Sequence, residues 1–182
     1  MLEQIKKLLL LSTLIVFGLG GTLLTLTNIL ITLVLPAANS ASTFTAFRVA
    51  VFIYTLYSVN AVGYYILIGT GAVRLCTTIQ FISAGFSLIL IAIGGVTAGL
   101  VGCVIGNAGY LGTLLMLSLS MEKIGVSYMQ WIKWLTPAFS WFLVVVIANL
   151  LFVDSPALKV GIFLVQTLVL VKLAWRDKTF FT

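Results

Sequence analysis

The chain has 182 residues, of which 62% are hydrophobic and only 8% charged, and its mean hydropathy is +1.24. A soluble domain carries about 25% charged residues, so this composition excludes a soluble fold and indicates a polytopic α-helical membrane protein. The net charge of +6 comes from basic residues scattered at the ends of apolar runs. That scatter excludes a nucleic-acid-binding surface and fits membrane topology.

The apolar runs are about 20 residues long and apolar on every face, which is typical of membrane helices rather than of the short alternating strands of a barrel. We therefore predict an all-α fold: a polytopic membrane bundle of six transmembrane helices in one domain, residues 1–182. The expected spans lie at about 8–35, 44–68, 75–93, 96–118, 131–152 and 157–175. The first run is longer than the apolar segment of a signal peptide, about 7–15 residues, so we expect it to remain uncleaved.

Glycine spacing is the most distinctive pattern in the chain. A polar break at 69–74 precedes an apolar helix, and a second break at 94–97 is expected to form a tight outer turn. The helix that follows carries glycines 4, 3, 4 and 3 residues apart, which on an α-helix fall on one face. Small residues at this spacing let membrane helices approach closely. The predicted helix-packing residues are Gly95, Gly99, Gly102, Gly106 and Gly109.

Six spans place both termini on the same side of the membrane, and the basic residues indicate which side. Short cytoplasmic loops are enriched in Lys and Arg. With both termini cytoplasmic, the outer ends hold Arg48 and Lys159. The inner ends then hold Lys6, Lys7, Arg74, Lys123, Lys133, Lys172, Arg176 and Lys178.

Residues for catalysis are scarce. The chain has no histidine, which excludes His-based acid–base chemistry and His-liganded metals. The four acidic residues lie at helix ends or in tails and form no intramembrane pair. The glycines at 69 and 71 lack the lysine and the preceding strand of a phosphate-binding loop. We expect no enzyme activity, no cofactor and no metal.

Transport requires only polar groups that face a cavity and are shielded from lipid. The candidate substrate-binding residues are Arg48, Asn60, Arg74, Gln80, Asn107 and Asn149, with Gln166 as a further polar position. Each has a plainer explanation. Arg48 can extend to the interface, Arg74 can anchor the topology, and a single Asn or Gln can join two helices by hydrogen bonds. The glycine face can be a packing surface or a sliding one.

Three stretches resemble the polysaccharide flippases, the O-antigen and exopolysaccharide translocases of the multidrug/oligosaccharidyl-lipid/polysaccharide exporter superfamily. The first is Leu67-Ile68-Gly69-Thr70-Gly71-Ala72-Val73-Arg74, and the second, after an apolar helix, is Gly99-Leu100-Val101-Gly102-Cys103-Val104-Ile105-Gly106. The third runs from Glu122 to Ser127 and leads into the Trp- and Lys-bearing segment 129–134. The order of these features is similar to the middle of one six-helix lobe, over about residues 30–178.

The resemblance implies movement of lipid-linked oligosaccharide across the bacterial inner membrane by alternating access of two lobes. The expected partners are membrane lipid, that oligosaccharide, and a second six-helix lobe or another copy of the chain. A full member has two lobes, whereas this chain resembles a C-terminal lobe alone. Its outer turn at 94–97 also lacks the usual proline and aromatic residue. A truncated reading frame, a split-gene subunit and a dimerising half all fit one lobe.

Two other functions remain open from the sequence. One is a small non-transporting membrane scaffold or regulatory subunit that packs on partners through its glycine-faced helix. The other is an unrelated small transporter or channel subunit.

Overall fold

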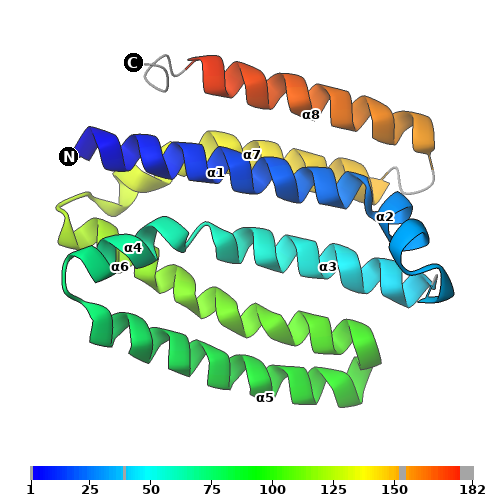
Figure 1. Ribbon diagram of the computed structural model, residues 1–182, viewed down its shortest axis with the longest axis horizontal. Helices are drawn as coiled ribbons and strands as arrows, with labels where there is room; N and C mark the ends of the chain where they lie inside the picture. The colour runs from blue at the N-terminus through cyan, green and yellow to red at the C-terminus, as the bar shows by residue number, and fades with distance from the viewer. Residues whose placement is uncertain (1, 39, 152–154, 177–182) are drawn as a thin grey trace. The chain divides into compact units, whose positions relative to one another are not determined.

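The computed structural model describes residues 2–38, 40–151 and 155–176, and every regular element in them is helical (Figure 1). This confirms the all-α prediction. The elements in chain order are α1 (Leu2–Thr25), α2 (Thr27–Val34), η1 (Pro36–Ala38), α3 (Ala41–Ser58), α4 (Ala61–Gly69), α5 (Val73–Gly106), η2 (Asn107–Leu114), α6 (Leu115–Lys123), α7 (Tyr128–Leu151) and α8 (Pro156–Arg176). Part of the break predicted between the spans at 131–152 and 157–175 lies outside the described residues.

Among the described residues, four helical stretches are long and apolar enough to cross a membrane, as expected of an integral membrane protein. They are Leu2–Thr25, Ala41–Gly69, Val73–Lys123 and Tyr128–Leu151. The first helix begins at Leu2, so the basic lead around Lys6 and Lys7 is already helical. The second stretch joins α3 and α4 across a short irregularity at Val59 and Asn60.

The contacts divide the chain into two compact units. Unit 1 combines the two ends of the chain, Met1–Leu26 and Met129–Thr182, and unit 2 is the continuous segment Thr27–Tyr128. Each unit therefore has its own packing.

Unit 1 consists of α1, α7 and α8 (Figure 1). Phe17 of α1 stacks on Phe142 of α7, with ring centroids 5.0 Å apart. On α8, Gln166 donates a hydrogen bond to the carbonyl of Gly18, 2.8 Å away. A Cβ atom on Gly18 would lie 2.9 Å from Leu170 Cδ1. The aromatic stack therefore holds α7 against α1. The absence of a side chain at position 18 lets α8 pack closely on α1.

Unit 2 is organised around a helical hairpin and the crossing of α4 with α6. At that crossing, a Cβ on Gly63 would lie 2.5 Å from the Cα of Leu117, so glycine permits the contact. Leu67, Cys76 and Met116 form a buried cluster beside it. The two connections at this end of the unit are adjacent, because Lys123 Nζ donates to the Thr70 carbonyl at 3.2 Å.

The hairpin turns at Ala98 and Gly99, not at the predicted 94–97. The φ of Gly99 is +58° and its ψ is −136°, a conformation open almost exclusively to glycine. The first limb therefore extends to residue 97, and the second begins at about residue 100. The predicted boundary was wrong because glycines 94 and 95 are tolerated inside the helix, where they face the returning chain.

The glycines do not share one helical face. Gly99 forms the turn, and Gly95 lies on the first limb, where a Cβ would meet only Cys103 Sγ, at 2.8 Å. On the second limb, Gly102 faces the Gly94 backbone, Gly106 faces Leu90 and Ile91, and Gly109 faces Ser87. These three residues let the second limb pack directly on the backbone of the first.

Candidate functional site

An aromatic and amide cluster lies where α3 contacts η2 in unit 2. Its members are Tyr54, Tyr57, Asn107 and Tyr110, which we call the α3–η2 cluster. Tyr54 Oη donates to Asn107 Oδ1 at 3.2 Å. The rings of Tyr57 and Tyr110 meet edge to face, with centroids 6.0 Å apart. Tyr54 is 47% exposed, so the cluster is accessible from outside the unit.

The unusual helix η2 determines which residues enter this cluster. Eight residues of 3₁₀ helix is long, since such runs rarely exceed 3–4 residues. With three residues per turn, positions 106, 109 and 112 align in one row and positions 107, 110 and 113 in the next. The first row contains glycines that face α5, at Ser87 and Ser83 among others. Close packing of the glycine row thus presents Asn107 and Tyr110 to α3.

Asn107 is tied to its own helix as well as to α3. Its Nδ2 lies 3.3 Å from the Cys103 carbonyl and 3.4 Å from the Val104 carbonyl. These donations to the preceding turn orient the amide so that its oxygen meets the Tyr54 hydroxyl. The amide is half-buried and therefore fixed in place while one edge of the cluster remains open.

Arg48 lies nearer the start of α3 and is half-buried. Its Nη2 donates to Asn28 Oδ1 of α2 at 3.0 Å. Because Asn28 is neutral, this contact orients the guanidinium without compensating its charge. An arginine held in this way retains donors suited to bidentate binding of phosphate.

Three further amides are buried and bridge helices. Asn60, 5% exposed, directs Nδ2 at Met116 Sδ, 3.7 Å away, in unit 2. In unit 1, Asn149 donates to Thr25 and Gln166 to Gly18 and Thr22. These contacts are the interhelical bonds expected for single amides in membrane helices.

Arg74 and Gln80 are exposed on the first limb of α5. Among the described residues, neither side chain forms a hydrogen bond to another helix. The structure thus brings Asn107 into a cluster, pairs Arg48 with Asn28, buries Asn60 and Asn149 between helices, and leaves Arg74 and Gln80 at the surface.

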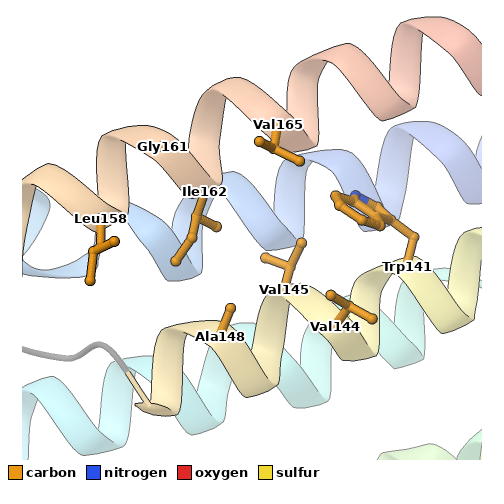
Figure 2. A pocket seen from close by; sticks show the side chains of 8 residues that line it. All are labelled: Trp141, Val144, Val145, Ala148, Leu158, Gly161, Ile162 and Val165. Atoms are coloured by element: carbon orange, nitrogen blue, oxygen red, sulfur yellow. The ribbon is translucent and has the colours of Figure 1, made fainter.

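A groove of about 340 Å³ lies between α7 and α8 in unit 1 (Figure 2). Its lining is almost wholly apolar, and the indole Nε1 of Trp141 is itself buried without a hydrogen-bond partner among the described residues. The lining residues are Trp141, Val144, Val145, Ala148, Leu158, Gly161, Ile162 and Val165. Such a groove accommodates hydrocarbon and offers no group to bind a polar headgroup.

The tyrosines of the α3–η2 cluster were not among the residues selected from the sequence. Tyr54 and Tyr57 are three residues apart, which indicated one helical face, but their partner Tyr110 belongs to a helix 53 residues beyond Tyr57. Tyr110 lies one turn after Asn107 in η2. Sequence periodicity places Asn107 and Tyr110 on one helical face, but it cannot show that this face lies against α3.

Comparison of the chain with protein-family models, with curated proteins and with solved structures gives no match.

Proposed function

We propose that the chain is one six-helix half of a transporter that moves lipid-linked oligosaccharide across a bacterial inner membrane by alternating access, with both termini cytoplasmic. The observation that carries the proposal is the α3–η2 cluster. Three tyrosines, one of which donates its hydroxyl hydrogen to an oriented amide, lie together on helices of membrane-spanning length.

This combination suits the chemistry of a sugar. A pyranose ring presents C–H groups on its faces, which pack on aromatic rings, and hydroxyls at its edge, which pair with amides and phenols. Tyrosine provides both an apolar face and a polar tip. Because the cluster is half-buried rather than enclosed, a glycan can reach it without unfolding the unit.

Arg48 supports the same substrate class. A lipid-linked oligosaccharide carries phosphate between its lipid and its sugar, and a partly desolvated guanidinium is the side chain best suited to bind phosphate. The proposed role for Arg48 is phosphate binding, with Asn28 holding the guanidinium in place. The cluster recognises the glycan.

The alternative is a scaffold that docks partners through its glycine face, and it requires that face to be free. Gly102, Gly106 and Gly109 pack on the chain's own first limb, so that surface is occupied within unit 2. No other observation in the described residues favours the scaffold.

Transport can be measured in lipid vesicles that contain the purified chain and a polyprenyl-diphosphate-linked oligosaccharide with an epitope for a lectin. Translocated glycan is protected from an external glycosidase. We expect protection to increase with time for the native chain, to fall at least tenfold for Asn107→Ala, and to fall several-fold for Tyr54→Phe, which loses only the hydroxyl.

Gln80→Ala is the matched control, because Gln80 is an exposed amide outside the cluster and its replacement should leave protection unchanged. Native chain that protects no glycan, as a homodimer or with a second lobe supplied, would refute the proposal. Equal activity of Asn107→Ala and native chain would remove the cluster from the mechanism.

A further inference from the structure

The helix η2 interrupts the second limb of the hairpin with eight residues of 3₁₀ helix. Long runs of this kind are uncommon because their hydrogen-bond geometry is poorer than that of an α-helix, and inside a longer helix they often mark a hinge. At Asn107 φ is −63° and ψ is −13°, and at Leu114 φ is −59° and ψ is −20°. Both pairs are closer to 3₁₀ helix than to α-helix. Contacts outside η2 must therefore stabilise this form.

Packing on the first limb of α5 is one such contact. A Cβ on Gly109 would lie 2.5 Å from the Cα of Ser87, and a Cβ on Gly112 would lie 2.8 Å from Ser83 Oγ. Ser87 Oγ also donates to the Gly106 carbonyl at 3.2 Å. Three residues per turn align these glycines in one row, so the first limb lies directly against the backbone of η2.

An α-helical η2 could not pack in this way. At about 100° per residue, positions 109 and 112 turn about 60° and 120° away from position 106, and Tyr110 comes to within about 40° of it. A tyrosine side chain does not fit against the first limb where even a Cβ would meet the backbone of Ser87. The α-helical form therefore requires the two limbs to separate, and it moves the ring of Tyr110 away from that of Tyr57.

The side chain of Asn107 stabilises η2 at the point where the helix type changes. Its main-chain N–H reaches the carbonyls of Val104 and Ile105, whereas in an α-helix it would bond to the Cys103 carbonyl. The side-chain Nδ2 takes that place, 3.3 Å from the Cys103 oxygen. Tyr54 Oη donates to Oδ1 of the same amide. The amide thus replaces a hydrogen bond that the 3₁₀ form gives up, and α3 holds it in position.

We propose that η2 is a conformational switch of unit 2 between a 3₁₀ form, held by the hydrogen bond from Tyr54 to Asn107, and an α-helical form. Breaking that bond favours the α-helix and the separation of the limbs. The rise per residue then falls from about 2.0 Å to about 1.5 Å, which shortens the eight residues by about 4 Å. Any ligand that competes for the Tyr54 hydroxyl would thereby change the length of the second limb. The switch goes beyond the proposed function, because it concerns the backbone of unit 2 and needs no glycan.

The test is a distance measured across η2 by double electron–electron resonance, with the full chain in lipid vesicles. Nitroxide labels are placed at Leu100→Cys and Leu115→Cys, which are 53% and 60% exposed, in a background with Cys76 and Cys103 replaced by alanine. We expect one main distance in this background. Tyr54→Phe should add a distance shorter by about 4 Å or more. The ratio of short to long distances should rise about fivefold, the effect of losing one ordinary hydrogen bond.

Asn107→Leu should increase the share of the short distance further, because it also removes the bond to the Cys103 carbonyl. Tyr65→Phe is the matched control, since Tyr65 is an exposed tyrosine of α4 outside the α3–η2 cluster, and it should leave the distance unchanged. An unchanged distance in Tyr54→Phe would overturn the proposal and make η2 a static element.

A folding defect cannot obscure this result. Tyr54→Phe removes one oxygen from a side chain that is 47% exposed, so it decides the question even where Asn107→Leu does not fold. No glycan is present in the experiment, and its failure is therefore distinct from failure of transport.

Discussion

At the scale of single residues, glycines matter where they touch another backbone and not where they face open space. A Cβ on Gly106 would lie 2.6 Å from the backbone carbon of Leu90 and would also meet Ile91. Main chain cannot move aside as a flexible side chain can. The same atom on Gly85, in the first limb of α5, would meet nothing within 4 Å. A side chain is therefore excluded by packing at position 106 but not at position 85.

We predict that Gly106→Ala lowers the free energy of unfolding by about 1–3 kcal/mol, the usual cost of overpacking. Gly85→Ala should leave stability unchanged or raise it by up to roughly 1 kcal/mol, because alanine is the better helix former. Thermal unfolding of both variants in one detergent measures the difference. Equal melting temperatures would contradict the backbone contact between the two limbs.

The site residues show how far sequence reasoning reaches at this scale. Polarity in an apolar chain marked Asn60 and Asn149 as candidate substrate-binding residues, and the structure buries both between helices, where an amide in a membrane helix finds a partner. It marked Gln80 equally, although Gln80 is exposed. Composition cannot tell these cases apart, because burial depends on which helix lies opposite. The tyrosines of the α3–η2 cluster were not among the candidate site residues for the same reason.

At the scale of elements, Gly99 determines where the hairpin of unit 2 reverses. Its φ of +58° with ψ of −136° is strained for any residue with a Cβ, by about 1–3 kcal/mol. No atom lies within 4 Å of a Cβ at this position. The effect of a substitution would therefore come from the backbone alone.

We predict that Gly99→Ala lowers the free energy of unfolding by that amount despite the open space. Gly69→Ala is the control, because Gly69 is equally open and has no positive φ. The two variants can be compared by thermal unfolding at one protein concentration. If Gly99→Ala were as stable as Gly69→Ala, the reversal would lie elsewhere, for example at the 94–97 position that the sequence favours.

Most helices could be predicted from the sequence, because an apolar run of membrane length has few other structures open to it. The hairpin turn and η2 could not. Glycines at steps of 4 and 3 fit an α-helical face, yet positions 106, 109 and 112 also fit a 3₁₀ row. The choice depends on register between the limbs, where Gly102 meets Gly94 and Gly109 meets Ser87. Such pairings arise only when both limbs are folded.

At the scale of the molecule, the hairpin of unit 2 has the dimensions of a membrane crossing. Residues 73–97 rise about 37 Å as an α-helix, which exceeds the roughly 30 Å of bilayer hydrocarbon. The connections before α5 and after α6 lie together, joined by Lys123 and Thr70. Arg74 and Lys123 are both at this end, and basic residues favour the cytoplasm. The turn at Ala98 and Gly99 should then face outward.

This topology predicts the labelling of single cysteines in spheroplasts by a membrane-impermeant maleimide. In a background with Cys76 and Cys103 replaced by alanine, Val96→Cys near the turn should react, since Val96 is 90% exposed. Glu122→Cys, at the other end of the hairpin and also exposed, should react only after permeabilisation. The opposite pattern would reverse the orientation while retaining the hairpin. Equal labelling of both positions before permeabilisation would mean that the turn and the basic end share one side of the membrane, and unit 2 would then not cross it.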